Sequence, residues 1–121
     1  MASVSVLAEA NHRFMIEEAL ASGAVARATA AALKQAGPAV IACLRVYEDD
    51  MRAVRDCLRQ ILPFDEPTLT AAARERRRCG LLTNDSILVA TMRRHGIELL
   101  ASADRDFERV KGITLFAPDD L

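Results

Sequence analysis

The sequence has few aromatic residues and no long apolar run. Only 4% of its 121 residues are aromatic and tryptophan is absent, which argues against a surface on which nucleic-acid bases stack. No apolar run approaches the ~20 residues that cross a bilayer, and the start of the chain does not have the pattern of a cleaved signal peptide. These absences predict a cytoplasmic protein without a membrane partner.

Neither sign of charge is in excess. The chain carries 16 basic and 17 acidic residues, with a net charge of −1. A protein that binds nucleic acid or an anionic membrane over its whole surface usually has a clear excess of positive charge. Any site for such a partner must therefore be local.

Cysteine and histidine are too sparse to form a zinc site. The three cysteines lie far apart in the sequence, at Cys43, Cys57 and Cys79, and an odd number does not suit a secreted disulfide framework. We expect reduced and mostly buried thiols. His12 and His95 have no Cys or Glu at zinc spacing, and no nucleophile-elbow, phosphate-binding or dinucleotide-binding motif is present.

Apolar periodicity predicts one domain, residues 1–121, in which helices alternate with short strands. Glycine and proline mark the element ends, at Gly23, Gly37, Gly80 and Gly96. We expect strands over residues 3–7, 61–64, 98–101 and 113–116, and helices over residues 47–60, 67–79 and 85–95. Residues 8–20 and 24–35 fit two helices or one kinked helix. This alternation is typical of an α/β protein with three α/β/α layers and a central, mostly parallel sheet.

Acidic residues occur where these elements meet. Glu9 follows the first expected strand, Asp104 and Asp106 follow the strand over residues 98–101, and Asp85 opens the helix before that strand. In parallel sheets, sites form beyond the carboxyl ends of the strands. Carboxylates gathered there repel one another unless a cation lies between them, and their hard oxygens favour Mg²⁺ or Mn²⁺. The pattern predicts a metal site.

Each acid also has a purely structural interpretation. Asp85 suits the first turn of a helix, where the helix dipole favours a negative charge and Thr83 or Asn84 could cap the helix. Asp104 could cap a short helix that runs to Phe107, and Glu9 could be an exposed acid of a first turn. For each residue alone the structural interpretation is the simpler one, and only the combination indicates a site.

Three segments carry a resemblance to a known family. The segment "SVSVLAEA" at residues 3–10 resembles the strand–helix junction that ends in the glutamate of the PIN domain, the ribonuclease fold of VapC-type toxins. The segments "GLLTNDSILVATMRRHG" at residues 80–96 and "LLASADRDFERVKGITLF" at residues 99–116 are similar to its later acidic helix and its Asp-x-Asp-Phe turn. The resemblance implies that Glu9, Asp85 and Asp104 hold Mg²⁺ or Mn²⁺, with Asp106 as an accessory ligand.

The resemblance also implies a reaction and partners. It implies hydrolysis of RNA phosphodiesters by metal-activated water and inhibition by a small antitoxin protein, with Arg105 and Arg109 as candidate contacts to the phosphates. PIN domains usually begin with a strand that ends in Asp, and this chain has no such strand, so we expect an N-terminally shortened fold with impaired cleavage. The alternative is a catalytically silent domain used for binding or dimerisation. Apolar surface left uncovered by that strand predicts a homodimer, with the alanine-rich residues 8–35 as the contact.

Overall fold

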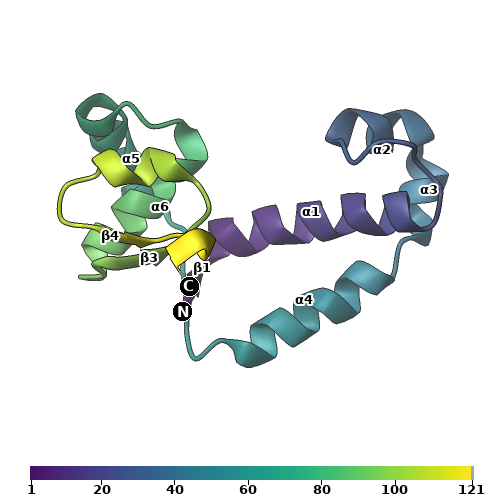
Figure 1. The fold of residues 1–121 in the computed structure, drawn as a ribbon, viewed down its shortest axis with the longest axis horizontal. Helices are drawn as coiled ribbons and strands as arrows, with labels where there is room; N and C mark the ends of the chain where they lie inside the picture. The colour runs from purple at the N-terminus through teal and green to yellow at the C-terminus, as the bar shows by residue number, and fades with distance from the viewer. Residues whose placement is uncertain (121) are drawn as a thin grey trace. The chain divides into compact units, whose positions relative to one another are not determined.

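The computed structural model describes residues 1–120, and the chain divides into two compact units, Met1–Ile61 and Leu62 onward. The described residues form six α-helices and four short strands, which pair into two sheets of two strands each (Figure 1). This helix-rich mixture with a parallel strand pair is compatible with the α/β class expected from the sequence.

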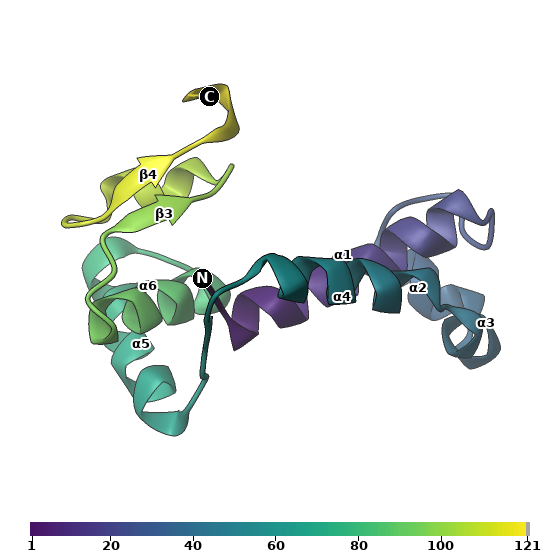
Figure 2. The same ribbon diagram turned by 90° about the horizontal axis from the view of Figure 1, so that it is seen from below.

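Helices make up most of the first unit. Its elements are β1 (Ala2–Ser3), α1 (Val4–Ala21), α2 (Ala30–Ala36), α3 (Pro38–Cys43) and α4 (Val46–Cys57). The two long helices, α1 and α4, run side by side in both views (Figures 1 and 2). A buried apolar cluster joins α1 to the shorter helices and the loops between them, through Ile16, Ala19, Val25, Leu33 and Leu44. Strand β1 pairs with β2 (Ile61–Leu62), which lies at the boundary between the units.

The N-terminus of α4 is capped by a residue of α1 rather than by its own sequence. Arg45, at the N-cap position, makes no side-chain capping bond. The Glu18 carboxylate instead accepts hydrogen bonds from the backbone N–H groups of Arg45 at 2.8 Å and Tyr47 at 2.9 Å. These N–H groups have no partner within the helix, so Glu18 both satisfies them and places a negative charge at the positive end of the helix dipole.

In the second unit, two helices pack beside a parallel strand pair. Its elements are α5 (Glu66–Cys79), α6 (Thr83–Arg94), β3 (Leu99–Ala101), the 3₁₀ helices η1 (Arg105–Arg109) and η2 (Pro118–Asp120), and β4 (Thr114–Phe116). Leu99, Leu100 and Ala101 of β3 pair in parallel with Thr114, Leu115 and Phe116 of β4 (Figure 2). Buried Leu81, Val89, Phe107 and Val110 pack with side chains of both strands into one core.

The ends of α5 follow from local sequence chemistry. Asp65 accepts a hydrogen bond from the backbone N–H of Thr68 at 3.0 Å and a second bond from its hydroxyl, and Pro67 fits the first turn. The Thr68 side-chain bond, followed by its backbone bond and then by Arg94, lowers the pKa of Asp65. At the other end Gly80 has a left-handed φ of 66°, as predicted from the sequence.

The expected strand over residues 3–7 is wrong. Only Ala2 and Ser3 are extended, and α1 begins at Val4. The Ser3 hydroxyl accepts a hydrogen bond from the backbone N–H of Val6 at 3.3 Å. Serine is a favoured N-cap, and this cap together with the helical periodicity outweighs the β preference of the valines. Glu9 therefore lies inside α1 and does not follow a strand.

Two further expectations need correction. The helix expected over residues 24–35 begins only at Ala30, because Thr29 caps it by accepting a hydrogen bond from the N–H of Ala32. The three thiols are free, as expected, but only Cys79 is partly buried, whereas Cys43 and Cys57 are exposed.

Candidate functional site

Asp85 lies in the first turn of α6 and is half-buried. The N-cap residue of this helix is Leu82, which makes no side-chain capping bond, so neither Thr83 nor Asn84 occupies the cap position. The next residue, Ser86, is fully buried; its hydroxyl donates to the Thr83 carbonyl at 2.7 Å and accepts from Nη1 of Arg76 at 3.1 Å. The turn that carries Asp85 is thus fixed to α5.

Asp104 is exposed and lies in the loop that follows β3. Its backbone N–H donates to the Ser102 hydroxyl at 3.1 Å, and its Oδ1 accepts from the backbone N–H of Asp106 at 2.8 Å. The predicted capping role of Asp104 is therefore confirmed, with η1 as the short helix. These bonds hold the carboxylate at the start of η1, and a carboxylate keeps further lone pairs for another partner.

Asp106 and Arg109 link η1 to the end of α5. Nη1 of Arg109 donates to Oδ1 of Asp106 at 2.9 Å, while Nε and Nη2 donate to the carbonyl oxygens of Cys79 at 2.8 Å and Gly80 at 3.1 Å. The carbonyls at the end of a helix lack partners within it, and Arg109 satisfies two of them. Arg109 therefore has a structural role, and its contact with a phosphate stays a prediction.

Arg105, the other predicted phosphate contact, is also paired. Its Nη1 lies 2.8 Å from Glu108 and its Nη2 lies 3.3 Å from Asp119. Half of the Arg105 side chain is exposed, so these ion pairs are worth ~1 kcal/mol or less each. A phosphate could displace such contacts at little cost.

The segments that carry Asp85 and Asp104 belong to one packed region of the second unit. Leu81, just before α6, shares a buried cluster with Phe107 of η1, and Arg109 bonds η1 to the turn between α5 and α6. Sequence reasoning had placed these acids on different segments of one sheet edge. The structure places both segments against the same core.

Glu9 belongs to the first unit, on an exposed part of α1. It lines a pocket of about 700 Å³ together with His12, Arg13 and Ile16 of the same helix and Thr29 before α2. The pocket lining includes an acid, Glu9, and a base, Arg13, so it carries both signs of charge.

Among residues 1–120, no three His, Cys, Asp or Glu side chains are grouped as a metal site requires. The donor chemistry of Asp85 and Asp104 nevertheless fits a hard divalent cation. Mg²⁺ takes oxygen ligands, keeps several waters and is commonly held by one or two carboxylates together with substrate phosphates.

A polar pocket between α5 and α6 does not follow from the sequence, although its arginines belong to the basic run "RERRR" and to the Arg93–Arg94 pair. Arginines of both helices surround the buried acid Glu75 there. The feature of the sequence that indicates this pocket is the single acid, Glu75, within "RERRR". A glutamate can form ion pairs with arginines three or four residues away on the same helix.

Comparison with known proteins gives one match. The family described as PIN domain matches residues 45–113, which run from the start of α4 through η1 and include Asp85, Asp104, Asp106, Arg105 and Arg109. Glu9 lies outside the matched residues. No curated protein and no solved structure matches the chain. In addition, none of the helices within residues 1–120 has the length and apolar character needed to cross a bilayer. The match covers more than half of the chain, which therefore belongs to the PIN domain family.

Proposed function

We propose that this chain is a metal-dependent endoribonuclease of the VapC toxin type, which hydrolyses RNA phosphodiesters. Membership of the PIN family indicates nuclease activity in general. The observation that carries the finer proposal is the position of two acids inside the matched region, Asp85 in the first turn of α6 and Asp104 after β3. Carboxylates at these two positions supply the hard oxygen ligands that Mg²⁺ and Mn²⁺ favour.

In this proposal Asp85 and Asp104 hold Mg²⁺ or Mn²⁺, with Asp106 as an accessory ligand. A bound ion of this kind supplies a water nucleophile at neutral pH and neutralises charge on the phosphoryl oxygens. The chain's own task is to hold the carboxylates in place. The Asp106 N–H orients Asp104, and the bonds of buried Ser86 fix the turn of Asp85.

The proposal extends to the whole chain and its partners. The protein works in the cytoplasm, where a small antitoxin protein inhibits it. It forms a homodimer through the alanine-rich residues 8–35. Light scattering at micromolar concentration tests this last point, and a monodisperse monomer would count against it.

Metal binding is measured by the melting temperature of the full chain as Mn²⁺ or Mg²⁺ is added. A ligand that binds only the native state stabilises it by about 1.4 kcal/mol at ten times its Kd, which corresponds to roughly 5 °C for a protein of this size. Asp104→Asn should abolish the shift. It should leave the fold intact, because asparagine caps a helix about as well as aspartate.

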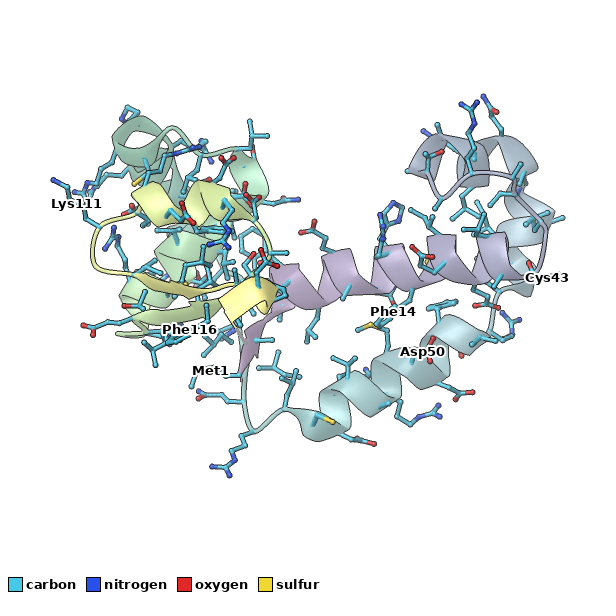
Figure 3. The ribbon with its side chains drawn as sticks, in the orientation of Figure 1. Met1, Phe14, Cys43, Asp50, Lys111 and Phe116 are labelled. Atoms are coloured by element: carbon cyan, nitrogen blue, oxygen red, sulfur yellow. The ribbon has the colours of Figure 1, made fainter. Side chains whose placement is uncertain are left out.

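The matched control is Asp50→Asn, the same change on an exposed residue of α4 that Figure 3 labels. This variant should retain the full metal-dependent shift. Two results would defeat the metal proposal: an unmodified chain whose melting temperature does not respond to either ion, or a response that Asp104→Asn leaves unchanged.

A further inference from the structure

A pocket of about 240 Å³ lies between α5 and α6 and is lined by four arginines around a single acid. Arg74 and Arg78 come from α5, and Arg93 and Arg94 come from the last turn of α6. The acid is Glu75, whose side chain is only 6% exposed. Nothing in the proposed metal site uses these residues.

Glu75 holds Arg93 of the neighbouring helix in place. Its Oε1 accepts a hydrogen bond from Nε of Arg93 at 3.0 Å and lies 3.7 Å from Nη1 of Arg78. Arg93 also donates from Nη2 to the carbonyl oxygen of Lys111, the residue labelled in the loop before β4 in Figure 3. A guanidinium held at two points loses little further conformational entropy when it binds a ligand.

The pocket keeps a net positive charge after these pairs are counted. Glu75 neutralises one guanidinium, and Asp65 neutralises Arg94 through a contact of 2.6 Å with Nη1. Arg74 is exposed and stands outside these ion pairs. Two acids pair with these four arginines, so two positive charges remain uncompensated and attract an anion.

We propose that this pocket binds a phosphate group of single-stranded RNA and anchors the strand beside the cleavage site. Guanidinium groups match the geometry of phosphate oxygens through paired N–H donors. Arg93 follows Asp85 by eight residues of the same helix, a rise of about 12 Å, so a short segment of RNA reaches from one to the other. The choice of RNA over another polyanion rests on the proposed ribonuclease function.

The test is the binding of a short fluorescent single-stranded RNA by the full chain, followed by anisotropy in EDTA over a range of salt concentrations. EDTA removes divalent metal, so binding is measured without cleavage. Arg74→Gln should weaken binding about fivefold at low salt and reduce the slope of log Kd against log salt by about 0.7. Arg77→Gln is the matched control, because Arg77 is exposed on the same helix and does not line the pocket.

Two comparisons decide the inference. Equal weakening by Arg74→Gln and Arg77→Gln, or none by either, would overturn the pocket while leaving the ribonuclease proposal intact. A chain that binds no RNA in EDTA would overturn the pocket, whereas the ribonuclease proposal is tested separately by cleavage in the presence of Mn²⁺ or Mg²⁺. An oligoglutamate peptide that binds as tightly as the RNA, with the same loss in Arg74→Gln, would overturn the assignment to RNA in favour of an acidic protein segment.

Discussion

Oε1 of Glu18, near the end of α1, accepts a hydrogen bond from the backbone N–H of Arg45 at 2.8 Å. The two residues are 27 positions apart in the sequence, and this bond joins the two long helices of the first unit. The N-terminal N–H groups of α4 thus find an acceptor in Glu18, although Arg45, the N-cap residue of α4, offers no side-chain acceptor.

Removing this cap should destabilise the protein. Glu18→Ala should lower the free energy of unfolding by about 1 kcal/mol, the usual cost of losing a side-chain cap. Glu17→Ala is the control in the same helix, since Glu17 only pairs with exposed Arg13 and its loss should cost less than about 0.5 kcal/mol. Urea unfolding of both variants measures the difference, and equal costs would show that the cap contributes nothing.

The contribution of Glu18 should also depend on pH. Burial pushes the pKa of Glu18 upward, but the backbone hydrogen bonds from Arg45, Tyr47 and Val46 outweigh this effect and lower the pKa below its usual 4.5. The native state therefore favours the ionised carboxylate. The stabilisation is fully present at pH values above the unfolded-state pKa and is lost as the pH falls through the lower native pKa.

This dependence can be measured as the difference in unfolding free energy between the unmodified chain and Glu18→Ala. The difference should be constant at neutral pH and shrink when the pH falls below about 4. A difference that grows toward acid pH would contradict the assigned direction of the pKa shift.

The buried acid of α5 should matter more than a shorter pair at the surface. The Glu75 side chain is 6% exposed, and its charge is shared by Arg93 and Arg78. Glu75→Gln removes this charge and should lower the free energy of unfolding by about 1–3 kcal/mol. Asp49→Asn breaks a contact of 2.6 Å to Arg52, but both side chains are more than half exposed, so the cost should stay below about 0.5 kcal/mol. Thermal or urea unfolding that ranks the two variants in the opposite order would refute this account.

Gly80 should tolerate few other residues. Its φ of 66° ends α5 in the left-handed region, where a β-carbon costs about 1–2 kcal/mol. Gly80→Ala should be destabilising by roughly that amount, and Gly80→Asn by less, because asparagine tolerates this conformation better. Equal stability of all three proteins would mean that the turn adjusts its backbone.

Local signals in the sequence predicted the second unit well. Gly80 as the end of α5, the strands β3 and β4, and Asp104 as a helix cap all follow from a few neighbouring residues, and each is confirmed. The first residues of the chain were predicted wrongly, because Ser3 suits both a strand and a helix N-cap. The structure shows that it caps α1.

Contacts between distant residues could not be read from the sequence. Glu75 and Arg93 are 18 residues apart and meet only because α5 packs on α6, and Glu18 finds α4 in the same way through packing on α1. Sequence spacing identifies candidate acids such as Asp85 and Asp104. It gives no distance between side chains that lie on different elements.

The most direct test of the central claim is cleavage of single-stranded RNA by the purified full chain with Mn²⁺ or Mg²⁺. The proposal predicts cleavage that EDTA stops and that Asp85→Asn or Asp104→Asn reduces at least a hundredfold, in line with the loss of a group that holds a catalytic metal. The Asp50→Asn control should cleave like the unmodified chain. Cleavage that persists in EDTA or in both acid variants, or a folded chain that binds RNA and metal without cleaving, would contradict the proposed ribonuclease function.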